Sequence, residues 1–360
     1  MQINIHSKIR DYSLIFSNNF CFLDKLLANP KVVIADNNVL TCYKDVLTSC
    51  FNADEIITFD AVEQNKNMNM VLQLCDTLMS YNAKKNMTVV SFGGGITQDV
   101  TGFLVSILYR GINWVYVPTT LLSQADSCLG SKTSLNYGHF KNLLGSFYPP
   151  SVVYIDVEFT KTLSKIDFYS GLGEIVKLHL MGGSRNIAAI MDEIDAIDAG
   201  RDNVELLTQL VQNSLQIKYS YIKDDEFDSG KRNLLNYGHC FGHALEASSG
   251  YAIPHGIAVV IGIIFANLVA VQRGLLSEKT AQNWYNSLLR KCILGRVGDN
   301  QHFSGEKILS AMKMDKKRTG EELPLIIIDD TLTLHKLTDI TPAEVLNTID
   351  YMLTFLDILE

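Results

Sequence analysis

The stretch VVSFGGGITQDVTGF, residues Val89 to Phe103, has the pattern of a strand, a glycine turn and the start of a helix. Its first residues are β-branched and aromatic, which is typical of a buried strand. Glycines let backbone amides approach a phosphate, and the helix N-terminus adds a favourable dipole. The stretch therefore predicts a nucleotide-binding turn. A plain strand-to-helix turn stays open, because three consecutive glycines are not the GxGxxG fingerprint.

Short apolar runs alternate with helical patterns on both sides of this turn, which predicts a parallel sheet with crossover helices. A second expected strand, Lys31 to Asp36, also ends in a polar residue. Asp36, in ADNNV (Ala35 to Val39), is placed either to hydrogen-bond a ribose hydroxyl or simply to cap a helix. The expected strands are Lys31 to Asp36, Glu55 to Phe59, Met87 to Phe92 and Asn113 to Pro118, and the expected helices are Glu63 to Met79 and Asp99 to Leu108.

The pattern of apolar residues changes near Asp156, after the connection YPPSVVYID. From about Phe159 onward, nearly every long segment repeats its apolar residues with a helical period. We therefore expect two domains, residues 1–156 and 157–360, the second one helical with a lone strand at Leu323 to Asp329. Its expected helices are Tyr169 to Met181, Asn203 to Asp224, Leu234 to Ser248, Gly256 to Val271, Glu278 to Leu289 and Pro342 to Ile358.

The composition fits two packed domains, because 47% of the 360 residues are hydrophobic and only 19% are charged. A net charge of -8 without a block of lysines or arginines argues against nucleic acid, although a basic pocket for a small anion remains possible. Seven cysteines without a CxxC pair indicate reduced thiols, and the start of the chain lacks the apolar core of a signal peptide. We therefore expect a cytoplasmic protein.

The longest apolar stretch, Gly256 to Val271, is interrupted by Asn267 and is shorter than the ~20 residues that a membrane span needs. We expect a buried helix there and no membrane contact.

A second unusual stretch, Pro118 to Asn142, is dense in hydrogen-bond donors. We expect it to be a long ordered loop with a functional role, and a solvated surface loop is the alternative.

Three histidines and a carboxylate suggest a metal site. His239 and His243 lie one helical turn apart in LLNYGHCFGHALE, and His255 follows in IPHG. Two histidines at that spacing can share a metal, with Glu174 of GLGEIVKLH as a third ligand. Lys177 shares a helix face with Glu174, either as a buried functional pair or as a surface ion pair of little value. Core histidines without a metal remain the plain alternative.

The ordered motifs resemble those of the 3-dehydroquinate synthases and their relatives, the sugar-phosphate cyclases. The resemblance runs from about Asp36 to Gly320 through GGGITQDVTGF, YRGINWVYVPTTLLSQADS, KTSLN, KN, GEIVK, KRNLLNYGHCFGHALE and HG. It implies an N-terminal Rossmann-like domain that binds NAD and an all-α C-terminal domain that binds a divalent metal, zinc or cobalt. It also implies a homodimer.

The resemblance assigns roles residue by residue. It implies that Glu174, His239 and His255 bind the metal and that His243 contacts the substrate phosphate. The helical spacing alone instead predicts that both His239 and His243 bind the metal. The implied cofactor contacts are Asp36, Asn38, Glu63, Lys66, Gly94, Gly95, Asp99, Thr119, Thr120, Lys141 and Thr162. The implied substrate contacts are Asp126, Lys132, Asn142, Lys177, Lys218, Arg232, Asn236, His243 and Lys317. Arg110, in YRG, matches an arginine that reaches the neighbouring subunit's site, and a helix C-terminal cap is its alternative.

The implied reaction converts 3-deoxy-D-arabino-heptulosonate 7-phosphate into 3-dehydroquinate and phosphate, a step of aromatic amino acid synthesis through the shikimate pathway. It proceeds by transient NAD oxidation, phosphate elimination, re-reduction and aldol closure. Lys218 and Arg232 are both present, and a buried arginine without its anion would be costly, which favours a substrate with a carboxylate.

Four positions depart from the usual motifs, namely Ser131, Phe140, Ile257 and Ser164. They leave open a specialised cyclase that acts on sedoheptulose 7-phosphate or an amino analogue. A more distant alternative is a metal-dependent polyol dehydrogenase, which would release its NADH.

Overall fold

The computed structural model describes the chain except residues 27–30, 82–83, 139, 200–202, 294, 296, 298–299, 315–322 and 356–360. The described chain forms two compact units: unit 1 comprises Met1–Leu163 and Ile222–Glu226, and unit 2 comprises Ser164–Tyr221 and Phe227–Glu360. The short helix η5 (Val157–Thr162) lies beyond the expected boundary near Asp156 and belongs to unit 1.

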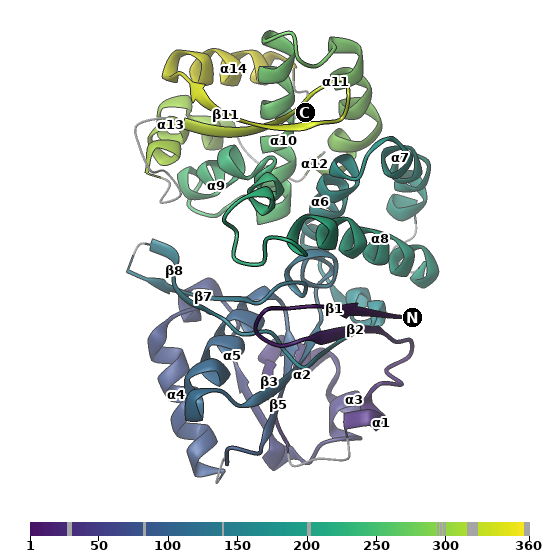
Figure 1. The fold of residues 1–360 in the computed structure, drawn as a ribbon, viewed down its shortest axis with the longest axis vertical. Helices are drawn as coiled ribbons and strands as arrows, with labels where there is room; N and C mark the ends of the chain where they lie inside the picture. The colour runs from purple at the N-terminus through teal and green to yellow at the C-terminus, as the bar shows by residue number, and fades with distance from the viewer. Residues whose placement is uncertain are drawn as a thin grey trace. The chain divides into compact units, whose positions relative to one another are not determined.

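Unit 1 contains a seven-stranded sheet in the order β1-β2-β9-β6-β5-β3-β4 (Figure 1). Only β1 (Gln2–Ile5) runs antiparallel, against β2 (Tyr12–Phe16), and the other pairs are parallel. The four strands expected from the sequence are present. They are β3 (Lys31–Asp36), β4 (Ile56–Phe59), β5 (Thr88–Gly93) and β6 (Asn113–Pro118), and β9 (Val152–Ile155) joins them.

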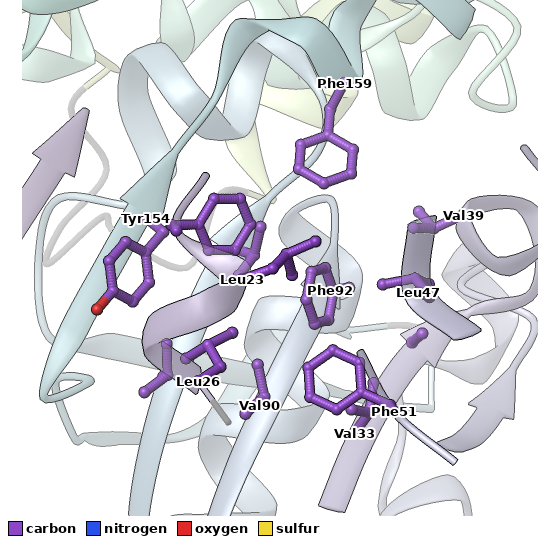
Figure 2. Close-up of a cluster of buried hydrophobic side chains, with 14 residues drawn as sticks. Leu23, Leu26, Val33, Val39, Leu47, Phe51, Val90, Phe92, Tyr154 and Phe159 are labelled. Atoms are coloured by element: carbon purple, nitrogen blue, oxygen red, sulfur yellow. The ribbon is translucent and has the colours of Figure 1, made fainter. Parts of the chain in front are cut away.

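The core of unit 1 consists of aromatic and aliphatic side chains between the sheet and three short helices, α1 (Leu23–Leu26), α2 (Asn37–Cys42) and α3 (Lys44–Thr48) (Figure 2). Phe92 of β5 packs edge-on against Phe51 and Phe159, and Phe22 stacks on Tyr154 with ring centroids 5.1 Å apart. Because these rings fix the sheet against its helices, they also fix the strand ends that carry the polar residues.

Two longer helices, α4 (Met68–Ser80) and α5 (Gly95–Ile107), also belong to unit 1, and α5 packs on β5 and β6. The helix expected from Glu63 begins only at Met68, because η2 (Glu63–Asn65) precedes it and the Asn67 side chain caps α4. Asn67 accepts a hydrogen bond from the amide of Met70, as a good N-cap residue does.

The expected loop over Pro118 to Asn142 is wrong as a description of the backbone. A π-helical turn (Ser123–Ser127) is followed by a hairpin of β7 (Lys132–Tyr137) and β8 (Phe140–Phe147). Thr133 and Leu135 alternate with exposed or half-buried neighbours, and β7 packs against α5. This alternation over few residues was hidden in the sequence by the many polar side chains.

Unit 2 is helical, as expected, with one antiparallel hairpin. Its helices are α6 (Lys165–Met181), α7 (Ser184–Ala199), α8 (Val204–Ile222, whose last residue belongs to unit 1), α9 (His239–Ser248), α10 (His255–Gln272), α11 (Glu278–Trp284), α12 (Arg290–Ile293), α13 (Gly305–Lys313) and α14 (Pro342–Phe355). The strand expected alone near Leu323 is β10 (Leu323–Ile328), and it pairs with β11 (Leu334–Ile340).

One expected helix starts later than its apolar pattern. Instead of a helix from Leu234, the structure has η6 (Lys231–Asn236), then Gly238 with φ +77, and α9 begins at His239. A β-carbon on Gly238 would lie 2.5 Å from the carbonyl oxygen of Val259. The close approach of α10 therefore requires both the glycine and the break.

Within the described residues, α10 is the one helix with the length and hydropathy of a membrane span, and 83% of its apolar window is buried inside the protein. The expectation of a buried core helix at Gly256 to Val271 is confirmed. The α/β unit 1 and helical unit 2 likewise confirm the expected fold class.

Candidate active site

The polar strand ends of unit 1 lie at the carboxyl edge of its parallel sheet. Asp36 ends β3, and Gly93 ends the adjacent strand β5. The chain passes from β3 to β4 on one side and returns to β5 on the other, which is the topological switch point where parallel sheets bind nucleotides. Asp36 also caps α2 by accepting the amide of Asn38, so both of its expected roles are compatible with the fold.

The three glycines after β5 differ in what they touch. A β-carbon on Gly93 would lie 2.2 Å from Oγ1 of Thr97, so packing alone requires glycine there. One on Gly94 would lie 3.0 Å from the side chain of Thr120. One on Gly95, the first residue of α5, would meet nothing closer than the Ser127 hydroxyl at 3.8 Å. Gly95 therefore leaves space at a helix N-terminus, a type of position that favours phosphate groups.

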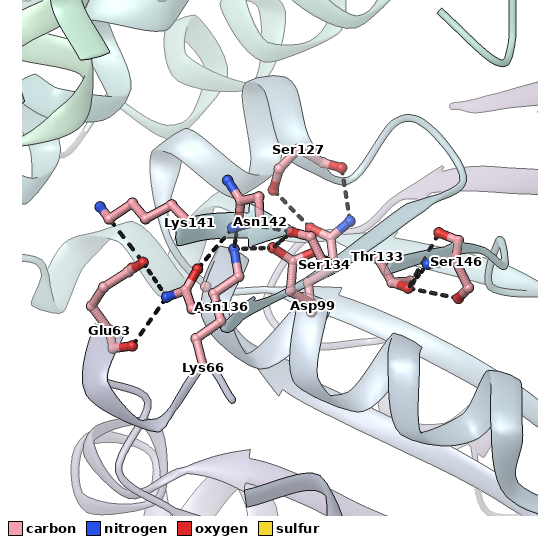
Figure 3. Close-up of polar contacts among 12 residues, drawn as sticks. Glu63, Lys66, Asp99, Ser127, Thr133, Ser134, Asn136, Lys141, Asn142 and Ser146 are labelled. Atoms are coloured by element: carbon pink, nitrogen blue, oxygen red, sulfur yellow. Dashed lines mark hydrogen bonds and ion pairs between the residues drawn. The ribbon is translucent and has the colours of Figure 1, made fainter. Parts of the chain in front are cut away.

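An ion pair between the buried Lys66 and the half-buried Asp99 lies at the centre of a polar network in unit 1 (Figure 3). Nζ of Lys66 lies 2.5 Å from the carboxylate of Asp99 and donates to Oδ1 of Asn142 at 2.6 Å. The amide and hydroxyl of Ser134 both donate to the same carboxylate. Burial raises the pKa of Asp99 although Lys66 and Ser134 oppose the shift. The network joins three expected site residues from separate elements.

Asn136 extends this network to the two remaining charged residues. Its amide nitrogen donates to the Glu63 carboxylate at 2.8 Å, and its Oδ1 accepts the backbone N–H of Asn142 at 2.9 Å. Lys141 forms an ion pair with Glu63 at 3.5 Å. Asn142 has φ +51, and the hydrogen bond that its backbone N–H donates to Asn136 stabilises this left-handed backbone. Sequence reasoning missed Ser134 and Asn136, and their alternation along β7 was the available signal.

The other expected residues of unit 1 are spread over several elements. Thr119 is buried after β6, and Thr120 shares a hydrogen bond with Ser123. Thr162 donates to the hydroxyl of Tyr43. Asp126 lies in the π-helical turn, Lys132 starts β7, and Asn38 lies in α2.

Arg110 is exposed and has a strained backbone. It ends η3 (Leu108–Arg110), and both Tyr109 and Arg110 have positive φ, at +52 and +61. Two consecutive non-glycine residues in the left-handed region cost roughly 1–3 kcal/mol each. Because α5 already ends at Ile107, Arg110 lies beyond α5, in the last turn of the short helix η3.

In unit 2, glycines bring three helices into backbone contact. A β-carbon on Gly173 of α6 would lie 2.4 Å from the carbonyl oxygen of Gly256, at the start of α10. A β-carbon on Gly262 of α10 would lie 1.9 Å from the carbonyl oxygen of Gly238, just before α9. Any larger residue would push these helices apart, so the glycines set the distances between α6, α9 and α10.

Each candidate metal ligand is a sequence neighbour of one of these crossing points. As a result, the chain places Glu174 after Gly173, His239 after Gly238, and His255 before Gly256. The reactive side chains therefore converge because the backbones do. The sequence signal was a glycine beside each of the three candidate ligands.

The Glu174 carboxylate contacts two of the three histidines. Its Oε1 lies 3.4 Å from Nε2 of His239 and 3.3 Å from Nε2 of His255, and its Oε2 lies 2.5 Å from Nζ of Lys177. The three imidazoles of His239, His243 and His255 offer ligand atoms within 4.8 Å of one another. A fully buried carboxylate beside two of three clustered imidazoles is a donor set that suits a divalent metal.

The local charges favour the ionised form of Glu174 and the neutral form of His239, but the charged form of His255. Burial opposes the charge on Glu174, but Lys177 and His255 outweigh it and lower the pKa of this carboxyl below its usual range. Burial, with Lys177 and the other histidines, lowers the pKa of His239. Against burial, Glu174 and Glu246 raise the pKa of His255 to about 10. A metal ligand has to be in its deprotonated form, which for histidine is the neutral imidazole.

Glu246 is a site residue that sequence reasoning missed. Its carboxylate lies 3.0 Å from Nδ1 of His255, on the opposite side of the ring from Glu174. A carboxylate behind a ligating histidine fixes the ring and its tautomer. Glu246 is one turn after His243 on α9, and this spacing was the available signal.

The described residues of unit 2 include three buried cations, namely Lys177 on α6, Lys218 on α8 and Arg232 in η6. Asn236, His239 and His243 line one pocket of unit 2. Lys317 lies outside the described residues.

Two family models match successive parts of the chain, "3-dehydroquinate synthase N-terminal" over residues 56–170 and "3-dehydroquinate synthase C-terminal" over residues 171–318. A 3-dehydroquinate synthase of Campylobacter concisus is 33% identical over 355 residues, which cover 97% of this chain and 99% of that protein. The chain belongs to the 3-dehydroquinate synthase family.

Two solved structures share the fold of this synthase family member. One is 2-epi-5-epi-valiolone synthase from Streptomyces hygroscopicus with NAD+ and Zn2+ bound, with a TM-score of 0.85, 21% identity, and 98% and 99% of the two chains covered. The other is 2-deoxy-scyllo-inosose synthase with carbaglucose-6-phosphate, NAD+ and Co2+, with a TM-score of 0.81, 23% identity and the same coverage. At these identities the likeness concerns the fold alone.

The departures from the synthase motifs have different structural settings. Ser131 and Ile257 are buried, whereas Phe140 is exposed at the start of β8. Ser164 caps α6 by accepting the amide of Asp167, which explains a serine at that position.

Proposed function

We propose that this chain converts 3-deoxy-D-arabino-heptulosonate 7-phosphate into 3-dehydroquinate and inorganic phosphate. The observation that carries the proposal is the buried Glu174 carboxylate within 3.4 Å of His239 and His255, in a member of the synthase family. The fold and the donor set suit a reaction that oxidises a hydroxyl transiently and eliminates phosphate.

We propose Glu174, His239 and His255 as the ligands of zinc or cobalt. The donor set fits, because these three groups converge and Glu246 supports one of them from behind. A divalent ion bound there polarises hydroxyl and carbonyl oxygens of the substrate. Lys177 balances the Glu174 charge and offers a proton donor beside it. His243 is assigned to the substrate phosphate rather than to the ion.

We propose that unit 1 binds NAD as a resident cofactor. The space at Gly95, the carboxylate of Asp36 at the switch point, and the ordered network of Lys66, Asp99 and Glu63 support this assignment. Bound NAD supplies a reversible acceptor for one hydride, so each turnover leaves it unchanged. The remaining cofactor contacts are assigned to Asn38, Gly94, Thr119, Thr120, Lys141 and Thr162.

The substrate carboxylate is assigned to Lys218 and Arg232. Both side chains are more than nine-tenths buried, and both are cations that suit a carboxylate group. Asp126, Lys132, Asn142, Asn236 and Lys317 complete the proposed substrate contacts. A sugar phosphate without a carboxylate, such as sedoheptulose 7-phosphate, is the second candidate, because Ser131 and Ile257 depart from the synthase motifs.

We further propose a homodimer in which Arg110 serves the neighbouring subunit. Large apolar side chains are exposed around it, including Ile107, Tyr109 and Met79, and the Tyr109 hydroxyl lies 3.8 Å from the Met79 sulfur. Exposed apolar side chains in such number mark an interaction surface. All seven cysteines are free thiols, which supports a cytoplasmic location.

The test is product identification with a panel of seven-carbon sugar phosphates. We expect stoichiometric phosphate and 3-dehydroquinate from the heptulosonate, without net change in NADH absorbance. Net NADH formation without phosphate release would instead indicate a polyol dehydrogenase. A cyclic product from sedoheptulose 7-phosphate alone would assign the second candidate.

A further inference from the structure

The pocket of unit 2 that contains His239 and His243 has one wall to which no role has yet been assigned. Pro324 and Ile326 of β10 and Lys336 of β11 line this wall. The helical side of the pocket includes Asn236 of η6 and the two histidines of α9. β10 packs against α9, and β11 packs against η6. The hairpin is therefore a wall of the same site.

The register of the hairpin explains why a lysine reaches this pocket. Ile326 and Lys336 are directly paired across the antiparallel strands, so their side chains are neighbours on one face. Ile326 is 1% exposed, whereas Lys336 is exposed. A lysine beside a buried apolar neighbour lays its methylene stem along that neighbour and presents its ammonium to the polar space.

The chemistry of the lining residues selects an oxyanion. The eight residues that line the pocket include one lysine, two asparagines and two histidines, and none of the eight carries a carboxylate. Across the described part of the chain, Lys336 forms no ion pair with an acidic residue. Lys218 and Arg232, assigned above to the substrate carboxylate, are not among the lining residues. The substrate phosphate is therefore the anion that we expect to bind beside the hairpin residues of this pocket.

We propose that Lys336 binds the phosphate of the substrate and favours phosphate esters over unphosphorylated sugar acids. The inference rests on the proposed function. It adds Lys336, which lies in a segment that follows the sequence motifs shared with the family. Lys336 acts on binding, because an exposed ammonium contacts the phosphate in the ground state and the transition state alike.

The test compares Lys336→Gln, Lys336→Arg and the control Lys307→Gln. Lys307 is an exposed lysine on α13 that does not line the pocket. Calorimetry with inorganic phosphate, and separately with quinate as a carboxylate without phosphate, measures binding without turnover. Kinetics with the heptulosonate phosphate then separate KM from kcat.

For Lys336→Gln we expect about tenfold weaker phosphate binding and a KM raised about tenfold, with kcat within about twofold and quinate binding unchanged. Lys336→Arg should retain most of the affinity, Lys307→Gln should match the wild type, and the difference should shrink at high salt. A melting temperature equal to the wild type excludes a folding defect.

Phosphate binding by Lys336→Gln equal to that of Lys307→Gln would overturn the inference, as would a wild type that binds no phosphate. If Lys336→Gln lost quinate binding instead of phosphate binding, Lys336 would be assigned to the carboxylate, and the inference would also be refuted. A wild type that binds phosphate through Lys336 but makes no cyclic product would refute the proposed function alone.

Discussion

Oε1 of Glu174 lies 3.3 Å from Nε2 of His255, although the two residues belong to different helices. The carbonyl oxygen of Gly256, next to His255, would lie 2.4 Å from a β-carbon on Gly173, next to Glu174. The ligand distance is therefore a direct result of a backbone crossing that only glycine permits.

Replacing Glu174 by Gln should weaken metal binding by at least about 100-fold, because even residues behind a metal ligand cost about 10- to 100-fold. Metal analysis of dialysed protein and competition with a chelator measure the effect. Chelation should abolish turnover in the wild type, and zinc or cobalt should restore it.

His243→Ala is the matched control on the same cluster. This variant should still bind the metal but bind the phosphate group more weakly. The expected signs are a raised KM and weaker inhibition by inorganic phosphate. If His243→Ala lost the metal while His255→Ala kept it, the assignment of the two histidines would be reversed.

Gly95→Ala should leave the fold intact and weaken NAD binding by about tenfold or more, because the new methyl group enters the space left for the pyrophosphate. Gly93→Ala should destabilise the protein by about 1–3 kcal/mol through its clash with Thr97. Thermal melting and NAD titration of both variants separate the two effects. Wild-type NAD affinity in Gly95→Ala would place the pyrophosphate elsewhere.

Arg232→Ala should weaken binding of the carboxylate substrate by about 2–5 kcal/mol, the range for truncating one partner of a buried charge pair. A sugar phosphate without a carboxylate should be affected far less. Lys231→Ala is the control, because Lys231 is exposed beside Arg232 and packs over the ring of Tyr221. Wild-type activity that is equal on both substrates would contradict the assignment.

Arg110→Ala and His239→Ala should each be folded and nearly inactive, for different sites. In a twofold dimer each subunit lends one Arg110 and borrows another, so a mixed dimer has one site with both residues intact. With random pairing, co-expression should restore about a quarter of wild-type activity. Verified mixed dimers that stay inactive would show that Arg110 either serves its own subunit's site or only caps a helix.

Local patterns predicted most elements but not their exact ends. β3 and β6 have the predicted bounds, because their apolar runs are bounded by polar or turn residues on both sides. The start of α9 was missed, because the apolar period continues through Leu234 while the approach of α10 forces a break at Gly238. The hairpin at Lys132 was missed because its inward alternation covers only two buried residues.

The sequence by itself determined the α/β and helical order of the two parts, the glycine turn at the end of a strand, and the residue types able to hold a metal. These follow from periodicity and side-chain chemistry, which are local properties. Only the tertiary structure decided that Glu174 lies between His239 and His255, that Glu246 supports His255 from behind, and that Lys336 faces the pocket of His243. Those distances depend on helix crossings and strand register, which bring together segments far apart in the chain.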